Sequence, residues 1–265
     1  TIDAQIISQK CLTVIYPYGD FNSDVVSITR NYYIAARGIS CGLNTEPFDF
    51  YTVRACNAEV EDIYAQTDAA EQQRVWFVAY FHSLVGAQEV DWGTYDIDMF
   101  TTYLDYLKRK NLWVGTFGAV VKYIRERSSA TISLVSSSSD QIVLSLTDTM
   151  DDAIYDQPLT IRSEVPSDWG TVTVQQGGST ITVAPVTEGA AKVIYYNAIP
   201  DRGLITLKDP QASNPQIASL VPQQAIAGSP AFVLTVTGSN FLSGAKVRWN
   251  GADRVTTFVS ATQLQ

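Results

Sequence analysis

The first half of the chain alternates between short apolar runs and helical stripes. Val75–Phe81 is a run of seven apolar residues, which suits a strand buried on both faces of a parallel sheet. Capping side chains predict one helix that begins at Asn22 or Ser23 and another that begins at Asp96 or Asp98. This alternation over residues 1–127 predicts an α/β layer or barrel.

From Ser128 onward the hydrophobic period changes from helical to twofold. Apolar residues alternate with polar ones along several short segments, and turn residues separate the segments. We therefore expect an antiparallel β-sandwich over residues 128–208. A proline-rich and polar stretch over residues 209–215 predicts a linker, and a new β pattern fills residues 216–265.

Composition narrows the possible partners. The 265 residues are 46% hydrophobic and 17% charged, as in soluble globular proteins, and the net charge is −9. This acidic balance argues against nucleic acid and anionic membrane surfaces as partners. No apolar run approaches the length of a transmembrane helix, so no membrane insertion is expected. The chain lacks an initial Met and a signal-peptide pattern, so we expect upstream sequence to be missing.

The three cysteines, Cys11, Cys41 and Cys56, have no Cys-x-x-Cys spacing, which argues against a zinc ribbon or a redox dithiol. Cys41 and Cys56 flank a loop and either pair in an oxidising compartment or remain thiols. The cysteine count does not decide the compartment.

His82 is the only histidine in the chain and follows the predicted strand at its carboxyl end. Parallel strands carry their chemistry at that end, and imidazole is the side chain whose ordinary pKa lies near neutrality. The alternative is a histidine whose hydrogen bonds are satisfied near the edge of the core.

Three stretches together resemble the C-terminal half of a bacterial polysaccharide deacetylase of carbohydrate esterase family 4. They are Tyr16-Pro17-Tyr18-Gly19-Asp20, the run ending in Tyr80-Phe81-His82-Ser83, and the helix-strand-helix pattern over residues 100–127. The middle β-domain is similar to accessory domains of such enzymes. Residues 236–241, 247–251 and 260–264 resemble a truncated IPT/TIG immunoglobulin-like module. The expected fold class is therefore multidomain α/β plus all-β: an incomplete distorted (β/α) barrel, an antiparallel β-sandwich and a partial Ig-like sandwich.

The resemblance implies hydrolysis of N-acetyl or O-acetyl groups with a divalent metal, usually zinc, held by an aspartate and two histidines. A second aspartate is the base and a late histidine is the acid. His82 matches that acid, and Tyr80 matches the acetyl pocket. The substrate groove is matched by the loop residues Tyr16, Pro17, Tyr18 and Gly19. Because side chains alternate along a strand, Tyr80 and His82 are expected to share a face.

The chain also departs from the family pattern. Val14 and Ile15 stand where an arginine is often found, and Asp91-Trp92 comes too late to supply the family's Asp-x-x-Asp-Trp motif. One histidine cannot supply a two-histidine metal site, so we predict that this chain binds no catalytic zinc.

Two hypotheses follow. The first is a fragment of an extracellular or cell-surface bacterial deacetylase that acts on a polysaccharide. The alternative is a non-catalytic carbohydrate-binding or surface-adhesion protein with a degenerate barrel. In that case Trp92, Trp169 and Trp249 either stack on sugars or are packing residues.

Overall fold

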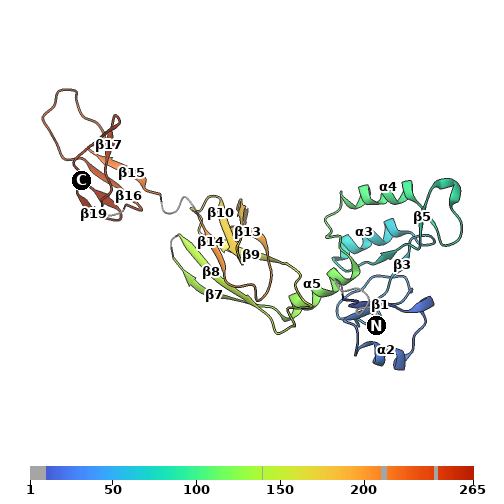
Figure 1. Cartoon of the computed structure of the whole chain (residues 1–265). Helices are drawn as coiled ribbons and strands as arrows, with labels where there is room; N and C mark the ends of the chain where they lie inside the picture. Colours follow the sequence, from blue (N-terminus) through green and yellow to red (C-terminus); the bar gives the residue numbers. More distant parts are fainter. Residues whose placement is uncertain (1–9, 139, 210–213, 242–243) are drawn as a thin grey trace. The chain divides into compact units, whose positions relative to one another are not determined.

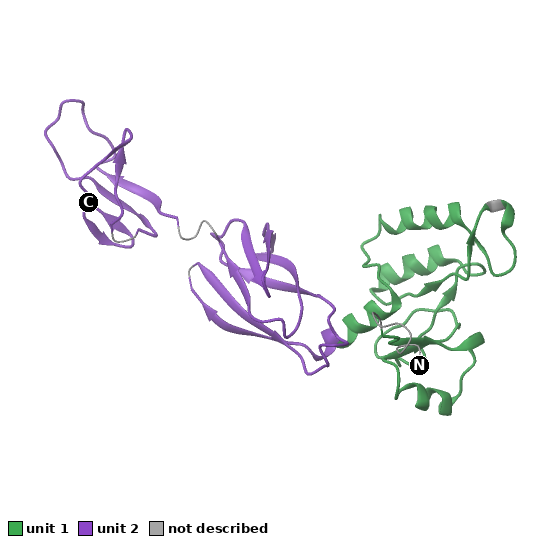
Figure 2. Ribbon diagram, in the orientation of Figure 1, with its two compact units in different colours: residues 1–125 green, residues 126–265 purple. Residues whose placement is uncertain are grey.

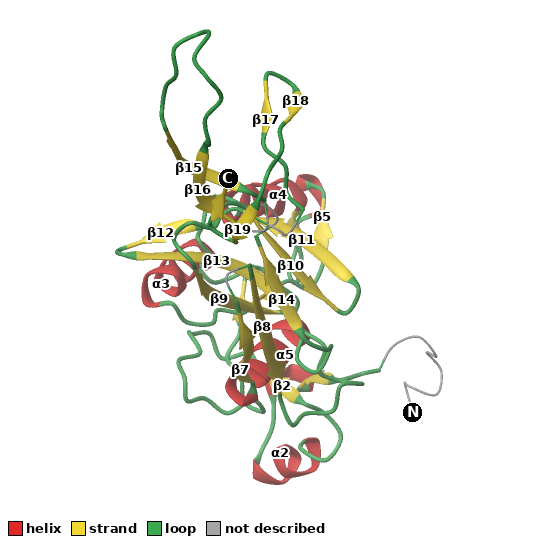
Figure 3. Ribbon diagram, turned by 90° about the vertical axis from the view of Figure 1, so that its left-hand side faces the viewer, coloured by secondary structure: helices red, strands yellow, loops and turns green. Residues whose placement is uncertain are grey.

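The computed structural model describes residues 10–138, 140–209, 214–241 and 244–265. The chain divides into two compact units, Thr1–Arg125 and Glu126–Gln265 (Figure 2). The boundary falls inside helix α5, Phe117–Ser129, close to the change of period in the sequence. Strands dominate the second unit, whereas helices α2 to α4 belong to the first (Figure 3).

Short parallel strands form the framework of unit 1 (Figure 1). Strands β1 to β6 are Thr13–Ile15, Ala35–Arg37, Cys56–Asn57, Ala79–Tyr80, Leu84–Val85 and Tyr95–Asp96. They pair in chain order, β1 with β2, β3 with β4 and β5 with β6. A parallel bridge between Arg37 and Val53 links β2 to the segment before β3. Unit 1 is therefore mixed α/β, and no closed barrel forms in the part of the chain that the structure describes.

Capping side chains start the helices of unit 1. The helices are α2 (Ser23–Thr29), α3 (Ile63–Gln73), α4 (Ile97–Leu107) and α5, with 3₁₀ turns η1 (Pro17–Gly19) and η2 (Ala87–Glu89). Asn22, Asp62 and Asp96 each accept two backbone N–H groups at the first turn of α2, α3 and α4. The predicted starts at Asn22 and Asp96 are confirmed. No helix among the described residues is long and apolar enough to cross a membrane.

The segment around β4 has two different faces. Phe77, Ala79 and Phe81 pack against a core cluster that includes Ile63 of α3 and Tyr103 of α4. Since side chains alternate along an extended chain, the residues between them point away from these helices. Tyr80 and His82 therefore share the opposite face, as the sequence predicts.

The prediction that Val75–Phe81 is one long strand buried on both faces is wrong. Only Ala79–Tyr80 is a strand, and residues 75–81 are half-buried. Phe77, Ala79 and Phe81 pack against the cluster of α3 and α4, whereas Trp76 on the other face stacks on Phe117 of α5 and contacts the ring of Phe48. The continuous apolar run thus combines one face packed on helices α3 and α4 with one face of aromatic contacts, and both faces are half-buried.

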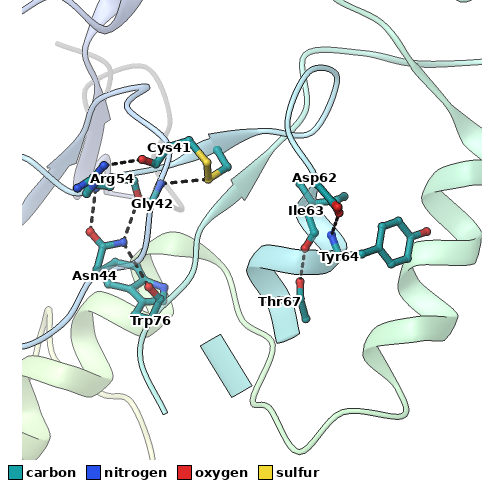
Figure 4. The surroundings of a disulfide bond; sticks show 10 residues. Cys41, Gly42, Asn44, Arg54, Asp62, Ile63, Tyr64, Thr67 and Trp76 are labelled. Carbon is teal, nitrogen blue, oxygen red and sulfur yellow. Dashed lines mark hydrogen bonds between the residues drawn. A yellow bond between two sulfur atoms is a disulfide. The ribbon is translucent and has the colours of Figure 1, made fainter. Parts of the chain in front are cut away.

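Cys41 and Cys56 form a disulfide, with their Cα atoms 4.1 Å apart (Figure 4). Asn44 holds the same loop, because its side chain accepts from the Arg54 N–H at 2.9 Å and donates to the Arg54 carbonyl at 3.0 Å. The paired alternative is thus confirmed for these two cysteines. Cys11 remains a thiol that donates to the Thr13 carbonyl.

The middle of the chain is antiparallel β-structure, as predicted. Strands β7 to β14 are Thr131–Ser137, Gln141–Thr147, Leu159–Val165, Val172–Gln176, Ser179–Val183, Val186–Glu188, Ala191–Ala198 and Ile205–Lys208. They form a five-stranded sheet in the order β11-β10-β14-β8-β7 and a three-stranded sheet in the order β12-β13-β9. Residues along β9 alternate between buried and exposed, so one face of that strand lines a core.

Trp169 is fully buried within this core, which excludes it as a sugar-stacking residue and confirms the packing alternative. Asp209 accepts the Gly170 N–H at 3.0 Å and is buried, so it is anchored to the β-structure that precedes the predicted linker. Residues 210–213 of that linker lie outside the described residues.

The C-terminal β-module is small. Strands β15 to β20 are Gln216–Val221, Thr235–Ser239, Arg248–Trp249, Ala252–Asp253, Phe258–Ser260 and Gln263–Leu264. They form the sheet β15-β16-β20-β19 and the hairpin β17-β18. Val236, Phe241 and Leu264 make its core, and Trp249 is half-exposed.

Candidate functional site

The candidate site lies at the carboxyl ends of the parallel strands of unit 1. Glu59 follows β3, His82 follows β4, and Asp96 ends β6. β3-β4 and β5-β6 are separate parallel pairs, but Glu59 and Asp96 line the same cavity, as does Asp62, the cap of α3. This placement confirms that His82 lies at the carboxyl end of a parallel strand.

His82 is fixed by Glu59 through both its backbone and its ring. The His82 N–H donates to Glu59 Oε1 at 2.9 Å, and His82 Nδ1 lies 2.8 Å from Oε2. The Glu59 side chain is 9% exposed and the His82 side chain 49% exposed, so the carboxylate lies beneath a more accessible imidazole. No described residue hydrogen-bonds to Nε2, which leaves that atom available to a ligand.

The environment keeps Glu59 ionised. Burial raises the pKa of Glu59, but hydrogen bonds from the His82 amide and imidazole and from Asn57 outweigh it and hold the pKa below its ordinary value. A carboxylate at Nδ1 orients the ring and fixes its tautomer. The pair therefore presents Nε2 in a fixed direction.

Aromatic rings flank the imidazole. Tyr80 meets it edge-to-face with ring centroids 5.6 Å apart, and Trp92 is stacked against it at 6.3 Å. The Trp92 side chain is exposed (92% for the residue), and the Trp92 backbone N–H donates to Asp91 Oδ1. Of the two tryptophans that remain candidates for sugar stacking, Trp92 is the one next to His82.

A cavity of about 680 Å³ opens beside Glu59. Its carboxylates come from Glu59, Glu61, Asp62, Asp96 and Asp98, and none of its described lining residues is Lys or Arg. Apolar atoms of Tyr64, Val90 and Met99 complete the lining. Such a cavity suits a neutral, hydroxyl-rich group better than an anion.

The loop Tyr16–Gly19 divides between core and surface. Tyr16 is buried, stacks on Phe21 and donates its hydroxyl to the Tyr51 carbonyl at 2.9 Å. Tyr18 is 97% exposed at the tip of η1, between Pro17 and Gly19. Tyr16 thus packs inside the unit, and Tyr18 presents the aromatic surface of this loop. No hydrogen bond or ring contact among the described residues joins the loop to His82.

Sequence reasoning missed Glu59. It lies 23 residues before His82, and only the parallel pairing of β3 with β4 brings the two together. The available signal was a carboxylate shortly after the extended stretch Asp49–Val53, three residues before the Asp62 cap. The expected Asp-x-x-Asp-Trp motif does not occur, so this glutamate had no template.

The residues around His82 do not fit a zinc site. Among the described residues, one set of three carboxylates, Asp148, Asp152 and Asp201, lies close enough to share an ion, and it belongs to unit 2. His82 is not part of that set, and its Nδ1 is occupied by Glu59. Glu59 joins the two parts of the site, because it pairs with His82 and also lines the acidic cavity, whereas His82 is not among the lining residues.

Comparisons with known proteins find a curated relative but no family. No protein-family model matches the chain, and no solved structure matches it. A curated relative named gellan lyase, from a Bacillus sp., is 28% identical over 277 aligned residues, which cover 92% of this chain and 11% of the relative. The chain therefore spans about a ninth of the length of that relative.

Proposed function

We propose that this chain is the proton-donating part of a metal-dependent polysaccharide deacetylase that hydrolyses N-acetyl or O-acetyl groups of a carbohydrate polymer. In this proposal unit 1 is an incomplete distorted (β/α) barrel. The observation that carries the proposal is the His82–Glu59 pair at the carboxyl edge of the parallel strands, beside a cavity large enough for a sugar unit.

Deacetylation of an amide needs a proton for the departing nitrogen. His82 is placed to deliver it from Nε2, while Glu59 holds Nδ1 and balances the positive charge of the imidazolium. General acid catalysis of this kind typically contributes about 10²- to 10⁴-fold in rate. The catalytic base and any metal ligands must come from residues other than those that surround His82.

The surroundings of His82 suit a polymer of neutral sugars. Trp92 and Tyr18 present exposed aromatic faces on which sugar rings stack, and Tyr80 forms a wall beside the imidazole. Pro17 and Gly19 set the turn that exposes Tyr18. The acidic lining of the cavity disfavours polymers whose reacting unit is an anion.

An extracellular or cell-surface location is part of the proposal. The Cys41–Cys56 disulfide supports it, because such bonds persist in oxidising compartments. A relative named for a lyase of a polysaccharide is also consistent with a protein that meets carbohydrate polymers.

The test is acetate release from acetylated chito-oligosaccharides by the full-length protein. His82→Ala should lower the rate by about 10²-fold or more, and Glu59→Gln should lower it less, because the imidazole remains. Glu164→Gln is the matched control, since Glu164 is exposed on β9 in the other unit. Unchanged turnover in His82→Ala would remove this residue from the mechanism.

The second candidate is a non-catalytic carbohydrate-binding or adhesion protein. The poor fit of the His82 surroundings to zinc favours it. In that case the full-length protein binds oligosaccharide without acetate release, and Trp92→Ala weakens binding while His82→Ala does not. A polymer product with a new carbon–carbon double bond, detected by ultraviolet absorbance, would instead show lyase chemistry and refute both candidates.

A further inference from the structure

Arg37 is a buried cation with few partners. It ends strand β2 and is only 8% exposed. Its Nη1 donates to the Gly38 carbonyl at 3.1 Å, and its guanidinium carbon lies 4.3 Å from the centroid of the Tyr80 ring. Among the described residues it forms no ion pair. The Arg37 guanidinium has five N–H donors, and its contacts are one neutral acceptor, the Gly38 carbonyl, and one aromatic face, that of Tyr80.

A second arginine of unit 1 shows the usual arrangement. Arg30 also lies 4.3 Å from an aromatic centroid, that of Tyr51, but its Nη2 is 2.6 Å from Asp49 Oδ2 and its side chain is 47% exposed. Arg30 is thus both exposed and paired with a carboxylate, whereas Arg37 is largely buried and has no carboxylate partner among the described residues, although none of its unbonded nitrogens is fully buried. Burying a guanidinium without an anion is costly, and burial lowers the pKa of Arg37 without discharging it.

Arg37 lies on the same face of the strands as His82. Its neighbour Ala36 packs with Tyr16 and Tyr51 in a core cluster that includes Val26 of α2. By alternation, Arg37 points to the face away from that helix. On β4 the corresponding face carries Tyr80, which contacts Arg37 on one side and His82 on the other.

We infer that Arg37 is a binding site for a carboxylate group of a ligand, next to the His82 site. A guanidinium offers two parallel N–H donors to a carboxylate, and a buried one gains most from such a pair. Arg37 is not among the residues that line the acidic cavity, so a carboxylate bound at Arg37 lies outside that lining, and the neutral remainder of the ligand extends past Tyr80. Two sources share this chemistry: free acetate, or a uronate unit of a polymer.

Binding is testable without any activity. The whole chain is titrated with sodium acetate, sodium glucuronate, glucose and sodium chloride at constant ionic strength, with calorimetry and the melting temperature of unit 1 as readouts. Saturable binding of acetate or glucuronate, but not of glucose or chloride, is expected. Acetate alone indicates a released product, and glucuronate indicates a polymer unit.

Arg37→Met should weaken carboxylate binding at least tenfold, Arg37→Lys should weaken it less, and Arg30→Met should leave it unchanged. In chloride buffer, Arg37→Met should melt no lower than the parent protein, because it removes an unpaired buried charge. No saturable carboxylate binding by the parent protein, or equal binding by Arg37→Met, overturns the inference. An Arg37→Met protein that melts far lower in chloride, together with no saturable carboxylate binding by the parent protein, would assign Arg37 a purely structural role.

The idea that the bound carboxylate is released acetate rests on the proposed function, whereas carboxylate binding at Arg37 does not. Loss of acetate release in His82→Ala with normal carboxylate binding separates the two claims. Carboxylate binding at Arg37 in a protein that never releases acetate would retain this inference and remove the deacetylase proposal.

Discussion

Opening the Cys41–Cys56 disulfide should destabilise unit 1 by about 3 kcal/mol. The bond closes a loop with a sequence separation of 15. For a loop of this length, the chain-entropy model gives about 3 kcal/mol at 25 °C, because the cross-link restricts the unfolded chain. The hydrogen bonds of Asn44 to Arg54 cannot replace this contribution, since they act only in the folded state.

The cleanest perturbations are reduction with dithiothreitol and the substitution Cys41→Ala. Cys56 is fully buried and accepts the Gly42 N–H at Sγ, so truncating it would add a cavity and an unpaired donor to the measurement. Cys41→Ala leaves that sulfur in place. The variant and the reduced parent protein should therefore agree within about 1 kcal/mol.

The assay is urea unfolding monitored by hydrogen exchange, which reports the two units separately. With a denaturant slope of about 1–3 kcal/mol/M, the midpoint of unit 1 should fall by about 1–3 M. All three cysteines lie in unit 1, so the transition of unit 2 is an internal control and should not move. A loss below about 1 kcal/mol in unit 1, or an equal shift in unit 2, would refute the loop-closure reasoning.

Three further changes test other parts of the molecule. Glu59→Gln should lower the stability of unit 1 by about 1 kcal/mol at neutral pH. The hydrogen bonds of Glu59 hold its pKa in the folded protein below the unfolded pKa of about 4.3. This difference stabilises the folded state at pH values above the unfolded pKa, and the stabilisation is lost as pH falls through the folded pKa. Glu59→Gln should therefore flatten the acid side of a melting-temperature profile, and an unchanged profile would contradict this. Thr67→Val should cost about 1–3 kcal/mol in urea unfolding, because the buried Tyr103 hydroxyl loses its partner at 2.7 Å, and a neutral effect would show that water replaces it. Gly238→Ala should cost more than about 1 kcal/mol and expose the C-terminal module to proteolysis, because the new Cβ would lie 1.8 Å from the Gln216 carbonyl oxygen; a protease-resistant variant would refute this.

Local signals predicted much of the fold. The caps Asn22 and Asp96 depend on residues a few positions apart, and the structure has them where the sequence predicts. The change to twofold alternation after Ser128 likewise marks the start of antiparallel sheets.

Long-range placement could not be predicted from the sequence. Glu59 reaches His82 because β3 pairs with β4. The apolar run Val75–Phe81 is compatible with a strand buried on two faces and with a strand buried on one. Tyr16 and Tyr18 are two residues apart, yet one is in the core and the other is exposed, because η1 turns the chain between them. Which side of an element faces solvent depends on what packs against the other side.

The alternation along β4 makes this segment sensitive to length more than to composition. Exchanging Phe77, Ala79 or Phe81 for other apolar residues changes how the helices pack but leaves the direction of His82 intact. Deleting one residue would turn every side chain of the segment to the opposite face and send the imidazole into the apolar layer. Natural or engineered variants of this strand should therefore differ by substitution and keep the number of residues from Phe77 to His82 unchanged.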